Sequence, residues 1–371
     1  MMNQQSQLFY QIALTQIKGV GDIIARNLLD IMGSEEAVFK SGRKALMAIH
    51  NISAKIVDAI LDPEVFRLAE KEMKFVEKNK LKTYFIKDNN YPLRLKDCTD
   101  APILLYYKGN ADLNNQKIVS IVGTRKSTNY GNSFCETFLQ DLALKHPDVL
   151  IVSGLAYGID IQAHRSALKA GLPTVGVLAH GLDRIYPSVH RKTAVDMLEQ
   201  GGLLTEFPSN TEPDKHNFVR RNRIVAGMAD AVIVVESDMK GGSLITADIA
   251  NSYNKQIFSL PGRISDPYSR GCNKLILDNK AGVILSADDF MDNMNWSNTT
   301  TKTVPKQKEL FLNLTEEQQK IYDVLQQSDS THVNLLSVET EIPVSQLFFI
   351  LLEMEMAGLI KPQPGGMYQL I

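Results

Sequence analysis

The chain has 371 residues and a formal net charge of −2, from 40 Lys and Arg against 42 Asp and Glu. This balance excludes a basic tail and an acidic, solvating polymer, so any site for a polyanion must be local. The length suffices for two or three domains with hydrophobic cores. Three separated cysteines without a Cys-x-x-Cys pair exclude a disulfide framework and a cysteine-rich zinc site.

The same features predict a cytoplasmic protein. A reducing compartment fits the cysteine spacing, and the first residues lack the basic and apolar regions of a secretory signal. The sequence contains no apolar run of the ~18 residues that a membrane span requires. We therefore expect no membrane span, and we expect neither a metal ion nor a cofactor.

Residues 1–80 are predicted to form an all-helical, SAM-like domain, because apolar residues recur at three- and four-residue spacing without a strand pattern. Within it, IKGVGDIIARNLL predicts two helices around a Gly-x-Gly turn, and IHNISAKIVDAIL repeats this outline without glycines. The pair resembles a helix-hairpin-helix module. Gly19 and Gly21 either let backbone N–H groups approach a DNA phosphate or only permit a tight turn, and the sequence leaves both open.

Residues 81–290 are predicted to form an α/β domain with a Rossmann-like, doubly wound, mostly parallel sheet. Apolar, β-branched runs of strand length alternate with segments of helical periodicity; the runs are KIVSIVG, DVLIVSG, PTVGVLA, GGLLTEF, ADAVIVVE and KQIFSLPG. Such sheets bind ligands at the carboxyl ends of their strands. The runs end in glycine-rich turns that are expected to gather in one crevice, at Gly123, Ser153–Gly154 and Ala179–Gly181, with Gly241–Gly242 soon after another run.

The remaining chain is predicted to be a linker, residues 291–314, and a domain, residues 315–371, that resembles a winged helix. The linker is rich in Asn, Thr and Lys, and the domain reads as helix, turn, helix and a Gly-Gly hairpin. Its segment Pro343–Pro362 has no arginine and carries Glu353 and Glu355. A recognition helix in a major groove carries basic and polar side chains, so a protein or dimer contact is favoured over duplex binding.

The crevice residues favour phosphate over other ligands. The stretch GTRKSTNYG after the first run is not Gly-x-Gly-x-x-Gly, and the sequence contains neither a Tyr-x-x-x-Lys pair nor a P-loop, which argues against a dehydrogenase and a P-loop NTPase. The turns SGLAYGID and KGGSLITA nonetheless place backbone N–H groups where helices begin. These turns are suited to anions.

Several cations, with one aromatic residue among them, indicate a nucleic acid rather than one mononucleotide. Arg125 follows the first run, and Lys215, Arg220, Arg221 and Arg223 precede the fifth without a matching carboxylate cluster. Helical spacing puts Arg220 and Arg223 on one side and Arg221 on the other. One of these arginines could instead pair with Asp183, Glu206 or Glu236.

Phe218 lies among these cations in the stretch KHNFVRRNR. An exposed ring beside Arg and Lys is how proteins hold single-stranded nucleic acid, with the backbone on the charges and a base on the ring. The competing hypothesis is a core ring that packs the helix onto the sheet.

Together these motifs resemble the DprA (Smf) family of DNA-processing proteins of natural transformation. The resemblance spans about residues 84–285, and its motifs occur in order as YPLRL, APILLYYKG, IVGTRKSTNYG, VSGLAYGIDIQAH, GVLAHGLDRIYP, LLTEFP, NFVRRNRIVAGMADAVIVVE, GGSLITADIA and LPGRISDPYSRGCNKLI. It implies a Rossmann-like domain that binds single-stranded DNA without strong sequence preference, protects incoming DNA, forms a homodimer and loads RecA for recombination. Such a protein is not an enzyme.

Carried over motif by motif, the resemblance implies a set of DNA-binding residues: Gly123, Thr124, Arg125, Ser153, Gly154, Lys215, Asn217, Phe218, Arg220, Arg223, Lys240, Gly241, Gly242 and Ser243. Two positions depart from the family pattern. Thr124 stands where serine is common and keeps the hydroxyl. Val219 stands where proline is frequent, which predicts a looser presentation of Phe218.

The alternative function is a nucleoside-monophosphate phosphoribohydrolase of the lysine-decarboxylase-like group, which uses a similar sheet. Those enzymes carry Pro-Gly-Gly-x-Gly-Thr and a glutamate on the next helix, whereas MKGGSLITAD lacks the third glycine and offers only Asp248. His164 and His180 would be the acid–base pair of such an enzyme. For His164, packing of its helix is the competing and favoured hypothesis.

Overall fold

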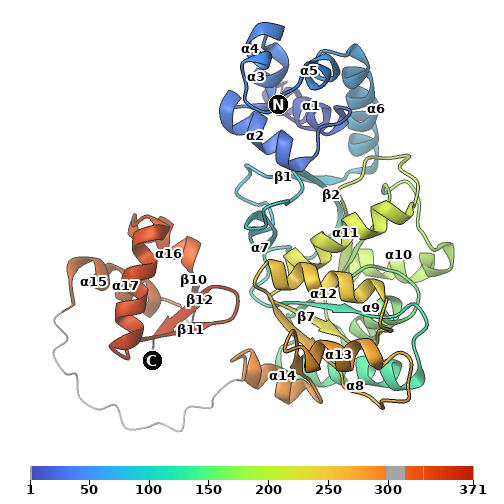
Figure 1. Cartoon of the computed structure of the whole chain (residues 1–371), viewed down its shortest axis with the longest axis vertical. Coiled ribbons are helices and arrows are strands. Elements are labelled where there is room, and N and C mark those ends of the chain that lie inside the picture. Colours follow the sequence, from blue (N-terminus) through green and yellow to red (C-terminus); the bar gives the residue numbers. More distant parts are fainter. Residues whose placement is uncertain (1, 298–313, 329, 371) are drawn as a thin grey trace. The chain divides into compact units, whose positions relative to one another are not determined.

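The computed structural model describes residues 2–297, 314–328 and 330–370 (Figure 1). It divides into two compact units, Met1–Val283 and Ile284–Ile371, and each is described by itself. The predicted domain boundaries stay predictions, and most of the predicted linker 291–314 lies outside the described residues. Within the described ranges no single helix is long and apolar enough to cross a bilayer. One pair of consecutive helices reaches the required length and apolar composition only when both are counted together, Val333–Thr340 and Val344–Met356, and the two are bent by 106°.

The first unit begins with six helices whose starts follow local capping chemistry. Ser34 and Ser53 accept hydrogen bonds from the backbone N–H of Ala37 and Ile56, and Asp62 caps a helix that has Pro63 at its first position. The helices are α1 (Met2–Gln16), α2 (Asp22–Met32), α3 (Glu35–Lys40), α4 (Arg43–Met47), α5 (Ala54–Ile60) and α6 (Pro63–Asn79).

The two predicted hairpins share a left-handed residue. Gly19 has φ 83°, and Asn51, at the matching point of the second hairpin, has φ 65°. Asparagine tolerates this region better than most residues, which explains how the second turn forms without glycine. The structure thus shows tight turns in both hairpins, and the phosphate hypothesis for Gly19 and Gly21 stays untested.

A nine-stranded sheet follows, in the order β1-β2-β6-β5-β4-β3-β7-β8-β9. From β6 onward in this order, neighbouring strands pair parallel as far as β9. Strand β1 pairs antiparallel with β2, and β2 pairs antiparallel with β6. All six predicted runs are strands, which with the helices on both faces confirms the predicted fold class. The strands are β1 (Lys82–Phe85), β2 (Leu104–Gly109), β3 (Ile118–Val122), β4 (Leu150–Ser153), β5 (Thr174–Val177), β6 (Gly201–Thr205), β7 (Ala231–Val234), β8 (Gln256–Ser259) and β9 (Gly282–Val283).

Helices cover both faces of this sheet, with α8, α9 and α10 packed in succession on one face and α11 against α12 on the other (Figure 1). Chain order therefore reverses beside β3, which lies between β4 and β7, and this reversal is where doubly wound sheets bind ligands. The helices are α7 (Leu93–Lys96), α8 (Asn129–Lys145), α9 (Ile159–Ala170), η1 (Ser188–His190), α10 (Arg191–Gln200), α11 (Lys215–Met228), α12 (Gly242–Ser252) and α13 (Arg270–Leu277).

Polar contacts join the helical segment to the α/β part of the first unit. Asp22, the first residue of α2, accepts a hydrogen bond of 3.0 Å from the backbone N–H of Ile103. Arg26, one turn later, donates to the backbone oxygen of Cys98 at 2.9 Å. On α6, the buried carboxylate of Glu72 accepts from the backbone N–H and the hydroxyl of Ser209.

The second unit contains the winged helix. Thr315 and Gln318 form a capping box at the start of α15 (Glu316–Gln326), the first helix of the winged helix. Ile321, Leu336 and Leu347 lie in the core of this domain. The strands form a sheet in the order β10-β12-β11. The elements are α14 (Ala287–Asn293), α15 (Glu316–Gln326), β10 (Thr331–His332), α16 (Val333–Thr340), α17 (Val344–Met356), β11 (Ile360–Gln363) and β12 (Met367–Leu370).

Candidate nucleic-acid interface

A cavity of about 620 Å³ opens at the carboxyl ends of β3 and β4, where chain order reverses. The turn after β3, the turn after β4, α11 and the start of α12 all contribute to its wall. Ten of the predicted DNA-binding residues line it, namely Gly123, Thr124, Arg125, Gly154, Lys215, Phe218, Lys240, Gly241, Gly242 and Ser243. The structure therefore brings together motifs that lie more than 100 residues apart in the sequence.

Four predicted residues do not line this cavity. Ser153 is fully buried at the end of β4, and its hydroxyl donates to the backbone oxygen of Ile121 at 2.6 Å. Asn217 donates from its side-chain amide to the backbone oxygen of Glu212 at 3.2 Å. These two residues support the backbone around the cavity. The other two are Arg220 and Arg223.

Arg220 and Arg223 point to the opposite side of α11, where carboxylates neutralise them. Arg223 is buried, and its Nη2 lies 2.5 Å from Glu206 Oε2 and 3.0 Å from Asp22 Oδ2. Arg220 Nη2 lies 2.6 Å from the same Glu206 oxygen, and its guanidinium lies over the ring of Phe207. The structure therefore does not bring these two arginines into the cavity, and their placement matches the alternative pairing with Glu206. A contact of either arginine with DNA stays a prediction.

Arg221 is the arginine of α11 that lines the cavity. The helical spacing had placed it opposite Arg220 and Arg223, which were predicted to face the ligand. Its Nη1 donates to the backbone oxygen of Gly154 at 2.6 Å and to that of Val177, so it ties the ends of β4 and β5 together. Burial lowers the pKa of Arg221 to about 10, partly offset by Asp160, so the guanidinium stays charged at neutral pH. The sequence feature that indicates this position is the three-residue spacing between Phe218 and Arg221, which places both side chains on one face of the helix.

Asp160 is the carboxylate beside this arginine in the cavity wall. Burial raises its pKa, while Arg221 and hydrogen bonds from the backbone N–H groups of Ala156 and Gly154 lower it. Asp160 therefore fixes the turn that follows β4.

Two aromatic rings border the cavity. Phe218 is half-buried, and its ring centroid lies 6.0 Å from that of Tyr186 with 53° between the planes. The guanidinium of Arg125 lies 5.1 Å from the Phe218 centroid. Phe218 is therefore not a fully buried core ring. Tyr186 is 46% exposed and was not anticipated, although it is the aromatic residue of the quoted stretch GLDRIYP.

The glycine turns present backbone to the cavity. Helix α12 begins after Gly241, which supplies no side-chain cap, so the first N–H groups of the helix are left for a ligand. At Gly154 an added Cβ would lie 2.2 Å from Arg221 Nη1, so any other residue would displace this guanidinium. Gly158 has φ 76° and packs against the backbone of Thr124 and Arg125, so the turns after β3 and β4 are in direct contact.

The residues suggested for hydrolysis lie elsewhere. His164 is fully buried with Nδ1 2.7 Å from Thr174 Oγ1, and burial lowers its pKa to about 3. His180 accepts a hydrogen bond from the backbone N–H of Tyr186 at its Nε2. Asp248 pairs with Lys280 at 2.8 Å on the surface. His164 thus packs its helix, and none of the three side chains lines the cavity.

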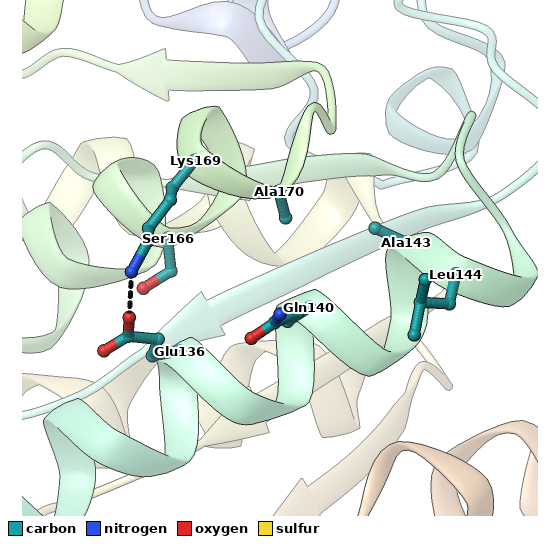
Figure 2. A pocket seen from close by; sticks show the side chains of 7 residues that line it. All are labelled: Glu136, Gln140, Ala143, Leu144, Ser166, Lys169 and Ala170. Atoms are coloured by element: carbon teal, nitrogen blue, oxygen red, sulfur yellow. Dashed lines mark hydrogen bonds and ion pairs between the residues drawn. The ribbon is translucent and has the colours of Figure 1, made fainter.

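A cavity of about 300 Å³ between α8 and α9 has different chemistry (Figure 2). Its cation Lys169 reaches across to Glu136 on α8, and its lining residues include neither an arginine nor an aromatic ring. This cavity lacks the groups that a polyanion requires. Across the described ranges, the side chains form no cluster of three or more metal-ligating residues.

Comparison with known proteins identifies the family. Residues 82–295 match the model of DNA recombination-mediator protein A, and residues 305–366 match that of the DprA winged helix domain. The chain belongs to the DprA family. Protein Smf of Synechocystis is 31% identical over 404 residues, covering 98% of this chain and 99% of that protein. Protein Smf of Escherichia coli is 35% identical over 290 residues, covering 76% of this chain and 75% of that protein.

Solved DprA structures share the fold. The structure of DNA processing protein A from Streptococcus pneumoniae superposes with a TM-score of 0.62 at 32% identity, over 76% of this chain and 97% of that one. A DNA processing protein A from Helicobacter pylori, described for its single-stranded DNA binding mode, gives a TM-score of 0.52 at 30% identity, over 59% of this chain and 98% of that one.

Proposed function

We propose that this DprA-family protein binds single-stranded DNA without sequence preference in the cavity beside β3. The observation that carries the proposal is that one cavity combines helix-start N–H groups, free cations and two aromatic rings. Among the described residues, Arg125 and Lys215 have no ion-pair partner, unlike Arg220 and Arg223. Unneutralised cations are what a phosphate backbone binds.

The chemistry of the wall assigns a part of the strand to each group. Phosphates lie at the start of α12 and on the turn that carries Arg125, where N–H donors and positive charge coincide. A base stacks against Phe218 and Tyr186, whose rings are 6.0 Å apart. Every base has a π-face, so stacking with backbone contacts gives affinity without sequence preference. Duplex DNA binds weakly because its bases are stacked on each other.

The family supports a biological role for this binding. Its model is named for recombination mediation, and we propose that the bound strand is delivered to a RecA-type recombinase and is protected until then. A homodimer would place two such cavities on one strand and raise affinity through effective concentration. Helix α17 exposes Phe349 by 73% and Met356 by 83%, which supports a protein contact rather than duplex binding for the winged helix. No catalytic step is part of the proposal.

Fluorescence anisotropy with labelled oligothymidylate and a labelled duplex tests this function. Wild-type protein is expected to prefer the single strand, and Arg125→Ala is expected to weaken it at least tenfold through loss of one charge-assisted contact. The matched control is Arg67→Ala, which removes an exposed arginine of α6 that does not line the cavity. Release of free base from a nucleoside monophosphate by a protein that binds no oligonucleotide would favour the phosphoribohydrolase alternative.

A further inference from the structure

A further cavity, of about 640 Å³, lies at the same edge of the sheet, past the carboxyl end of β8. Tyr130 from the first turn of α8 and the segment Pro261–Asp266 line it. These residues belong to the motifs IVGTRKSTNYG and LPGRISDPYSRGCNKLI, but the function proposed above assigns them no role. The cavity combines an accessible ring with an exposed arginine, the two kinds of group to which the function proposed above assigns the bases and phosphates of single-stranded DNA.

Tyr130 presents its ring in a fixed position. The side chain is 49% exposed, and its hydroxyl donates to the backbone oxygen of Pro261 at 2.6 Å. Burial raises the pKa of this hydroxyl, so it stays protonated and keeps the hydrogen bond at neutral pH. A ring that is held at both ends loses little conformational entropy when a base stacks on it.

The opposite wall is also held firmly. Asn273 of α13 accepts from the backbone N–H of Gly262 at 3.1 Å and donates to its backbone oxygen at 2.9 Å. These two bonds fix the turn that carries Arg263. Arg263 is exposed and has no ion-pair partner in the part of the chain that the structure describes, although Asp266 also borders the cavity.

One short loop connects the two cavities. Arg125 lines the first and Tyr130 the second, and the five Cα–Cα steps between them limit the separation of their Cα atoms to about 19 Å. An added Cβ at Gly123 or at Gly131 would meet the same side chain, Ile159, so both ends of this loop pack on one point. A strand that leaves the first cavity along this loop reaches Tyr130 within a few nucleotides.

We propose that Tyr130 is a second base-stacking platform and that Arg263 contacts the adjoining phosphate, so that single-stranded DNA spans both cavities. The proposal rests on the function proposed above and extends it from one nucleotide-binding cavity to a continuous path. The ligand of the second cavity is a nucleotide of the same strand.

An oligonucleotide length series tests the path. Affinities of oligothymidylates of increasing length are measured by anisotropy for the wild type, Tyr130→Ala, Arg263→Ala and Arg125→Ala. Tyr130→Ala is expected to bind the shortest oligonucleotides like the wild type and the longer ones about 5- to 150-fold more weakly, the change that the loss of one base–aromatic stack produces. Arg263→Ala is expected to follow the same length dependence, whereas Arg125→Ala weakens every length. Tyr130→Phe keeps the ring and is expected to retain most of the affinity.

The outcomes separate the two proposals. If Arg125→Ala weakens binding and Tyr130→Ala equals the wild type at every length, the second platform is refuted and the first cavity stands. If the wild type binds no length, both are refuted. A wild-type scan with the fluorescent base 2-aminopurine at successive positions requires no variant; two separated quenched positions support the path, and a single quenched region overturns it.

Discussion

Replacement of Arg223 by methionine is expected to destabilise the first unit without removing DNA binding. The guanidinium bridges Glu206 Oε2 at 2.5 Å and Asp22 Oδ2 at 3.0 Å, and it donates to the backbone oxygen of Asp100. Loss of one partner of a buried ion pair costs about 3–5 kcal/mol because the remaining charge stays buried. Arg220 still neutralises Glu206 at 2.6 Å, so we expect a loss near the lower limit, about 3 kcal/mol.

Urea unfolding followed by circular dichroism measures this loss. With a denaturant slope near 3 kcal/mol per molar, the midpoint is expected to fall by about 1 M. Arg220→Met is the matched control, because a half-exposed arginine contributes about 1 kcal/mol or less. The double variant Glu206→Leu with Arg223→Met is expected to recover part of the loss, since it also removes the stranded carboxylate.

Two results would refute this reasoning about Arg223. A midpoint shift below about 0.2 M would mean that the guanidinium is not a buried partner of Glu206. A tenfold loss of oligothymidylate affinity in the folded Arg223→Met variant would mean that Arg223 contacts the strand after all.

Two further predictions concern the cavity wall and a buried histidine. Gly154→Ala is expected to displace Arg221, whose Nη1 would lie 2.2 Å from the new Cβ, and to weaken oligothymidylate binding at least tenfold. The control is Gly42→Ala, where the new Cβ meets no atom within 4 Å. Equal affinity of the two variants would contradict the assignment of the turn. Burial lowers the folded-state pKa of His164 to about 3. Below about pH 6.5 the unfolded chain therefore takes up a proton at this residue and the folded chain does not. This difference is expected to lower the free energy of unfolding by about 2 kcal/mol between pH 7.5 and pH 5. Denaturant titrations at the two pH values should show a smaller fall in His164→Gln, and an identical fall in both proteins would contradict a neutral buried imidazole.

The parallel core of the fold could be predicted because strands buried on both faces appear as continuous apolar runs. Strands β3 to β7 are buried at every residue, and each coincides with a predicted run. The strands β1, β2 and β9 were not predicted. Strand β1 is four residues of mixed exposure and β9 is two exposed residues. Strand β2 is buried at its first four residues, but its apolar stretch was not among the predicted runs. Their pairing depends on neighbours already in the sheet rather than on a periodic pattern of their own.

The residues of the candidate site could likewise be predicted only in part from the sequence. Glycine turns and Phe218 could be located from the sequence because their role follows from local backbone and helix starts. The orientation of α11 could not, because Asp22 lies 201 residues from Arg223 along the chain and determines which arginines are neutralised. Helical spacing separated Arg221 from Arg220 and Arg223 correctly, but only the packed structure shows that Arg221 lines the cavity.

The central claim, that a DNA strand lies in the cavity beside β3, is tested most directly by a salt titration of oligothymidylate affinity in the wild type and Arg125→Ala. The account predicts that log affinity falls linearly with log salt and that the slope of the variant is shallower by about 0.7, the value for one phosphate contact on a single strand. Equal slopes and equal affinities in the two proteins would contradict it and place the strand elsewhere on the molecule.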